Sequence, residues 1–129
     1  MAKTVLVVER DPKDRERLGA WLEGAGYDVL ACPGPSAPEY TCLGSLRGVC
    51  PLASGADAIV LDCWLAGDSA LAGVSGLELL DFYLGTGKPV LALRHGAEAT
   101  LAFLAEDLAV VDWPADRHEL VETVRALIR

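Results

Sequence analysis

Two carboxylates in this sequence stand where an apolar run ends. Glu9 follows residues 5–8, and Asp62 follows residues 58–61. Short aliphatic runs bounded by polar residues are typical of buried strands. Strands that alternate with helices form a parallel sheet, and its ligands and chemistry lie at the carboxyl ends of the strands. We therefore expect Glu9 and Asp62 to meet at one edge of such a sheet.

The same rule brings four more side chains to this edge, namely Arg10, Asp11, Arg94 and Trp113. A guanidinium beside a buried carboxylate can neutralise it through two parallel hydrogen bonds. We predict that Arg10 or Arg94 forms such a bridge to Asp62; the alternative is that both guanidiniums point to solvent. The sequence contains no nucleophile–base pair, so it does not predict an enzyme.

Helix signals are strongest near the two ends of the chain. Asp11 followed by Pro12 is an N-cap with proline at the first helical position. An apolar stripe follows at helical spacing and consists of Leu18, Trp21, Leu22 and Ala25. We expect Gly26 to end this helix in the left-handed conformation. Asp116 and Glu119 form a capping box for a last helix. Its apolar face is Leu120, Val121, Val124, Leu127 and Ile128.

The remaining segments complete an alternation of strands and helices. We predict strands at residues 4–9, 27–31, 58–62, 89–93 and 109–111, with weaker helices at 39–47, 76–84 and 97–105. Residues 85–88 predict a turn, because Lys88 precedes a strand and not the helix of a phosphate-binding loop. The pattern predicts an α/β fold in a single domain spanning residues 1–129.

Composition excludes several classes of function. The formal net charge of −8 would repel a phosphate backbone, so we expect no direct contact with nucleic acid. No apolar run approaches the roughly 18 residues that a membrane span needs. The N-terminus leads directly into the first predicted strand without the features of a signal peptide, which favours a cytoplasmic location.

The cysteines and histidines do not predict a metal or redox site. The four cysteines are too far apart for a CxxC pair; they are Cys32, Cys42, Cys50 and Cys63. The sequence does not decide whether all four thiols are reduced or whether Cys42 and Cys50 form a disulfide. His95 and His118 are isolated in the sequence, and we expect His118 to be exposed.

Five blocks of this sequence resemble, in order, those of response-regulator receiver domains. The blocks lie at residues 5–12, 58–62, 76–80, 88–91 and 113–114. The resemblance implies a flavodoxin-like (CheY-like) fold, a doubly wound five-stranded parallel sheet of (βα)5 type. It also places Asp62 at the position that a histidine kinase or small phosphodonor phosphorylates, with Mg²⁺ held beside it by an acidic pair.

The sequence departs from the receiver pattern at most of the remaining site positions. The acidic pair is Glu9-Arg10, followed by Asp11, so a cation replaces a direct metal ligand. The hydroxyl position is Arg94, the lysine position is Trp113, and the switch aromatic position is Val110. Together these changes favour an atypical receiver, or pseudo-receiver, over a working phosphorylation site.

The resemblance therefore implies a signalling module of the two-component type that acts through protein contacts, without the usual Mg²⁺-dependent aspartyl phosphorylation. Its partner would be another signalling protein or domain, or a second copy, at the face formed by the fourth helix, fifth strand and fifth helix. We expect no metal. One alternative is a phospho-acceptor receiver, with Mg²⁺ gathered by Glu9, Asp11 and Asp62. Another is a sensor that binds a metabolite beneath Trp64 and Trp113.

Overall fold

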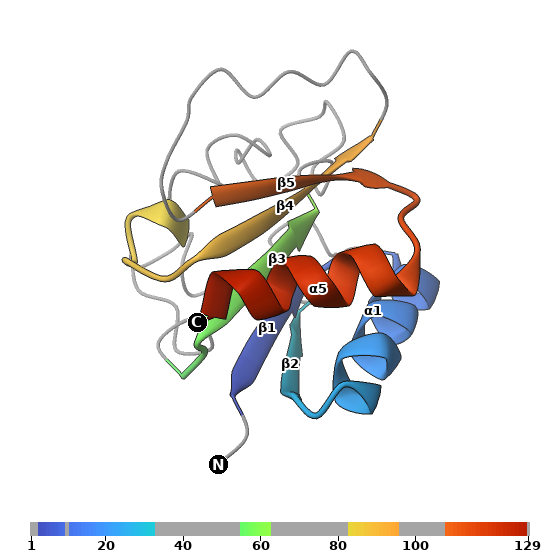
Figure 1. The fold of residues 1–129 in the computed structure, drawn as a ribbon, viewed down its shortest axis with the longest axis horizontal. Coiled ribbons are helices and arrows are strands. Elements are labelled where there is room, and N and C mark those ends of the chain that lie inside the picture. The colour runs from blue at the N-terminus through green and yellow to red at the C-terminus, as the bar shows by residue number, and fades with distance from the viewer. Residues whose placement is uncertain (1–2, 10, 33–54, 63–82, 96–107, 129) are drawn as a thin grey trace.

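The computed structural model describes residues 3–9, 11–32, 55–62, 83–95 and 108–128, with the backbone alone described for residues 94 and 95. These residues form five strands and two helices (Figure 1). The elements are β1 Thr4–Val8, α1 Pro12–Gly24, β2 Asp28–Cys32, β3 Ala58–Asp62, β4 Val90–His95, β5 Leu108–Trp113 and α5 Arg117–Ile128.

The five strands form one parallel sheet in the order β2-β1-β3-β4-β5. Its central strands are short aliphatic runs, and all five residues of β3 are buried. Near-continuous apolar sequence of this kind is characteristic of parallel strands that are covered on both faces. The order reverses between β1 and β3, which places a topological switch point at the carboxyl ends of these two strands. The predicted α/β class and five-stranded parallel sheet are confirmed.

Helix α1 begins and ends as its sequence predicts. The Asp11 carboxylate accepts hydrogen bonds from the Lys13 amide at 2.8 Å and the Asp14 amide at 3.2 Å, and Pro12 is the first helical residue. These bonds satisfy amides that have no partner inside the helix. The helix ends at Gly24, and Gly26 follows with a φ of 97°, a conformation that glycine adopts without steric cost.

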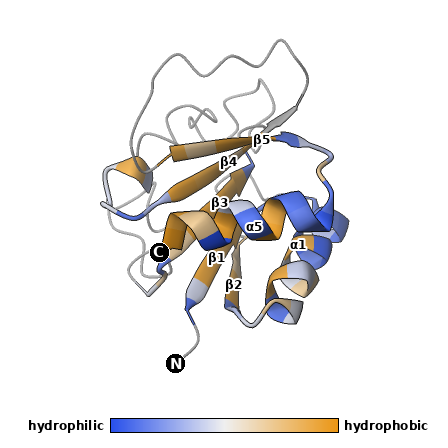
Figure 2. Cartoon of the chain, in the orientation of Figure 1, coloured by the Kyte–Doolittle hydropathy of each residue, from blue (hydrophilic) through white to orange (hydrophobic). Residues whose placement is uncertain are grey.

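Alternation along the strands divides the apolar side chains between the two faces of the sheet. One cluster combines β1, β3, β4 and β5 residues with the apolar sides of α1 and α5, the two helices that lie on one side of the sheet in Figure 1. The other cluster lies on the opposite face and includes Tyr83. Figure 2 shows the central strands as hydrophobic, while the helices are mixed. Burial of these side chains is the dominant favourable contribution to folding.

Strand β5 is longer than predicted. The predicted strand covered residues 109–111, whereas β5 runs from Leu108 to Trp113, and β4 continues to His95. Asp112 interrupts the apolar run, but its backbone pairs with Arg94 in the parallel ladder. Trp113 therefore lies in the sheet and not in a loop.

Helix α5 and the turn before β4 agree with their predictions. Asp116 accepts a hydrogen bond from the Glu119 amide at 2.7 Å at the start of α5. Residues 85–88 form a turn in which the Thr86 amide donates to the Tyr83 carbonyl. The helices predicted at 39–47 and 97–105, and most of that at 76–84, lie outside the described residues. Within the described part of the chain, no helix has the length and apolar content to cross a membrane.

Candidate functional site

Glu9 and Asp62 lie side by side at the carboxyl edge of the sheet. Val8 pairs with Leu61 in the β1–β3 register, so the next residue of each strand is the one that carries the carboxyl. Both residues are almost fully enclosed, with 2% of Glu9 and 5% of Asp62 exposed, and their side chains interact directly. We call these two residues the acid pair. The sequence prediction that they meet at this edge is confirmed.

The first turn of α1 surrounds Glu9. The Asp11 amide donates to Oε1 of Glu9 at 3.1 Å, and the guanidinium of Arg15 donates to the Glu9 backbone carbonyl at 2.9 Å. Arg15 was not among the predicted site residues. Its position four residues after the N-cap, on a helix that starts at the carboxyl end of β1, is the sequence signal that could have identified it. The bond from Arg15 holds the strand-to-helix connection close to the acid pair.

Burial changes the protonation of Glu9. Desolvation is the largest cause that raises the pKa of this carboxyl from 4.5 to about 9, and the hydrogen bond with Asp62 and the charge of Asp62 add to it. The amide of Asp11 acts in the opposite direction, because it stabilises the charged form. The Oε2 atom of Glu9 is buried and has no hydrogen-bond donor. Two ionised carboxylates only accept hydrogen bonds, so a direct bond between them requires a proton.

The described acids do not fit the Mg²⁺ site that the receiver resemblance implies. Asp11 is committed to capping α1, and no group of three or more potential metal ligands occurs among the described side chains. The acid pair is closed to solvent, whereas Mg²⁺ usually retains several water molecules. A protonated Glu9 is also a poor ligand, because metal binding requires the deprotonated group.

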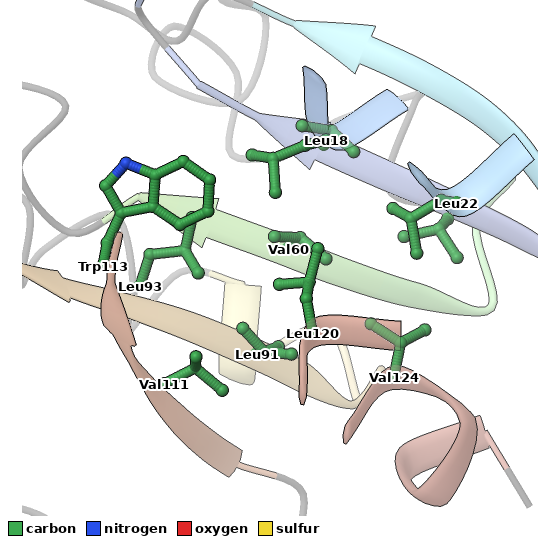
Figure 3. Close-up of a cluster of buried hydrophobic side chains, with 11 residues drawn as sticks. Leu18, Leu22, Val60, Leu91, Leu93, Val111, Trp113, Leu120 and Val124 are labelled. Carbon is green, nitrogen blue, oxygen red and sulfur yellow. The ribbon is translucent and has the colours of Figure 1, made fainter. Parts of the chain in front are cut away.

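Trp113, which stands at the lysine position of the receiver pattern, makes an apolar contact. Trp113 ends β5 with only 8% of its surface exposed, and its ring packs against Trp21 of α1 with the centroids 6.0 Å apart at 52°. Figure 3 shows the indole on the same side of the sheet as Leu18 and Leu93, within the core cluster. We call Trp21 and Trp113 the aromatic anchor. The peptide between Trp113 and Pro114 is cis.

The other predicted site residues fall into two groups. Val110, at the switch aromatic position, is on β5 and 41% exposed, and His118 is exposed as predicted. Arg10 and Trp64, the Arg94 and His95 side chains, and the proposed arginine bridge to Asp62 lie outside the described residues, as do Cys42, Cys50 and Cys63. Cys32 is buried.

Several solved receiver domains have a similar fold. The receiver domain of the hybrid histidine kinase CckA is 22% identical, with a TM-score of 0.65, and the match covers 98% of this chain and 99% of that one. A response regulator receiver domain protein from Bacillus halodurans is 21% identical, with a TM-score of 0.69 and coverage of 98% and 97%. A receiver protein from Sinorhizobium medicae is 16% identical, with a TM-score of 0.71 and coverage of 98% and 94%.

These likenesses establish the receiver-domain fold for this chain. No protein-family model matches the sequence, and a search of curated proteins found no match either. The strand order is the flavodoxin-like 2-1-3-4-5, in which ligands bind at the switch point beside β1 and β3. The acid pair occupies that place.

Proposed function

We propose that this chain is a receiver-like signalling module of the two-component type that acts through protein contacts, without Mg²⁺-dependent phosphorylation of Asp62. The observation that supports this most strongly is the buried indole of Trp113 at the lysine position. A lysine there would place a mobile cation near a phosphoryl group on Asp62. An indole that packs into the core offers no such charge for the phosphoryl oxygens.

The acid pair supports the same proposal. Phosphoryl transfer depends on cations that offset the charge developing between the acceptor and the incoming group. Here Glu9 stands beside Asp62 and carries a raised pKa, and the guanidinium of Arg15 donates to a backbone carbonyl. Metal binding requires a deprotonated carboxyl, so the raised pKa of Glu9 disfavours the Mg²⁺ on which this transfer depends.

Intact mass after incubation with acetyl phosphate and Mg²⁺ tests this proposal. We expect no added phosphoryl group, while a receiver with the complete site gains one under the same conditions. Circular dichroism of the same sample shows that the chain is folded. The second candidate function is phosphorylation of Asp62, which its place at the end of β3 favours. A gain of one phosphoryl group that Asp62→Asn abolishes would establish it and overturn the proposal.

The contact surface that we propose includes β5 and α5. Val110 stands out among the large hydrophobic side chains of the described residues because 41% of it is exposed, and it lies on the outermost strand. Exposed apolar residues on such a face are suited to binding a signalling partner or a second copy. Light scattering after size-exclusion chromatography would compare the wild type with Val110→Glu, using Ala20→Glu on the exposed side of α1 as the matched control. A dimer that survives Val110→Glu would exclude this surface from self-association.

A further inference from the structure

We propose that helix α1 is a clamp that holds β5 and the start of α5 in one conformation, so that the contact surface is presented without a switching step. Trp21 is the residue of α1 that fixes this surface. The inference rests on the proposed function, because the contact surface is the one proposed above on β5 and α5. It adds how that surface is regulated, namely that it is constitutive.

The middle of α1 reaches an outer strand of the sheet. β1, the strand that leads into α1, is separated from β5 by β3 and β4. Trp21 of α1 nevertheless packs on Trp113, the last residue of β5, with ring centroids 6.0 Å apart, a separation that favours aromatic pairs. Figure 3 shows the Trp113 indole among the core side chains. The end of β5 is therefore fixed by a helix that follows a different strand.

The start and the end of α1 are attached as well. In the first turn, the guanidinium of Arg15 donates to the Glu9 backbone carbonyl at 2.9 Å, which ties the helix to the end of β1. In the last turn, the guanidinium of Arg117 on α5 lies beside Gly24, where an added β-carbon would be 3.3 Å from its Nη2 atom. Helix α1 thus joins the end of β1 to the end of β5 and to the start of α5.

These attachments disfavour a second arrangement of the contact surface. A switch requires two packed arrangements of similar free energy, between which a ligand or a modification selects. Movement of β5 relative to β1 would separate the two rings of the aromatic anchor and expose apolar surface of Trp113, of which 8% is exposed now. Exposure of that surface to water is unfavourable, so the clamped arrangement should be the one that is populated.

Relaxation dispersion of the backbone amide nitrogens detects exchange between conformations in microseconds to milliseconds, and it tests the clamp directly. We expect flat dispersion profiles throughout α1, β5 and the first turn of α5 in the wild type. Trp21→Ala removes the contact at the middle of the clamp and should introduce an exchange contribution at these amides, largest at Val111, Asp112 and Trp113. Trp21→Phe retains a ring against Trp113 and should keep the profiles flat.

Val111→Ala is the matched control, because it truncates a buried side chain of the same strand and cluster and leaves both rings in place. Its profiles should stay flat although its stability is lower. Exchange at these amides in the wild type would overturn the inference, and so would flat profiles in Trp21→Ala. Equal exchange in Trp21→Ala and Val111→Ala would also overturn it, because the cause would be a general loosening of the core. Trp21→Leu takes the place of the alanine variant if that variant does not fold.

Failure of the clamp and failure of the proposed function give different results. A gain of one phosphoryl group on Asp62 would overturn the proposed function, while the profiles of the unphosphorylated chain would still decide whether α1 is a clamp. Exchange in the wild type without a gain in mass would overturn the clamp alone.

Discussion

The carboxyl edge of the sheet contains two regions of opposite chemistry. At β1 and β3 the acid pair keeps two carboxyls in a space almost closed to water, while at β5 the aromatic anchor fills the corresponding position with apolar surface. The first region is polar and buried, whereas the second belongs to the apolar core.

The contrast shows that one edge of a sheet can hold a buried polar pair and a packed aromatic pair at the ends of different strands. The parallel strand pairing continues to both regions. Stability should therefore depend on pH near the acid pair and on packing near the aromatic anchor.

The largest expected effect is at the aromatic anchor. Trp113→Ala removes a buried indole from contact with Trp21 and the core, so it should lower the free energy of unfolding by about 3 to 5 kcal/mol. Equilibrium denaturation measures the loss, with Val110→Ala on the same strand as the control, which should stay within about 0.5 kcal/mol. Equal effects of the two substitutions would show that the indole is not a core residue.

The second prediction concerns the acid pair, which should make the free energy of unfolding depend on pH. The pKa of Glu9 is raised from 4.5 to about 9 on folding, so the folded chain binds more protons between these values. The contribution of Glu9 to stability is then fully present below pH 4.5 and is lost progressively as the pH rises to 9. From pH 5 to 8 the loss should be on the order of 4 kcal/mol, because the folded chain binds close to one extra proton in this range and each pH unit then corresponds to about 1.36 kcal/mol.

Glu9→Gln is the matched variant for this pH dependence. Its amide can accept from Asp11 at the position of Oε1 and donate to Asp62 from the other terminal atom, with no proton to lose. The free energy of unfolding of Glu9→Gln should therefore vary less with pH than that of the wild type and exceed it at pH 8. Parallel profiles for the two proteins would show that Glu9 titrates normally.

A smaller effect compares the two helix caps, one beside each region. Asp11→Ala removes the acceptor of the Lys13 and Asp14 amides, and Asp116→Ala removes the acceptor of the Glu119 amide. Each should lower the free energy of unfolding by about 1 kcal/mol, as measured by thermal or denaturant unfolding. Asp11→Ala should leave the pH profile intact, because the amide of residue 11 still donates to Glu9. A changed profile would mean that the Asp11 carboxyl itself belongs to the acid pair's environment.

The smallest expected effect provides a baseline for both regions. Arg125 and Glu122 form an ion pair on the exposed side of α5, with both side chains about half exposed. Arg125→Ala should change the free energy of unfolding by less than about 0.5 kcal/mol, because water and salt screen such pairs. A larger change in low-salt buffer would indicate that this ion pair contributes more to the free energy of unfolding than solvent-exposed pairs usually do.

Local patterns were sufficient for much of the fold. Residues 58–62 have the boundaries of β3, and the caps at Asp11 and Asp116 begin helices where predicted. These features depend on short-range rules, in which a polar side chain satisfies helix amides or an aliphatic run is buried. The strand predicted at residues 109–111 lies within β5 but is too short, because Asp112 breaks the apolar run. The ladder with β4 continues through backbone bonds, which do not depend on side-chain polarity.

The position of the candidate site was predictable from the sequence, but the burial, protonation and packing of its side chains were not. The sequence alone determined that Glu9 and Asp62 would end two strands of a parallel sheet, since carboxylates after apolar runs must lie at its carboxyl edge. Only the tertiary structure decided that the two carboxyls are buried against each other, that Arg15 reaches the Glu9 carbonyl, and that Trp113 packs on Trp21. Protonation and packing depend on desolvation and on neighbours distant in the chain, and those are set only when the elements assemble.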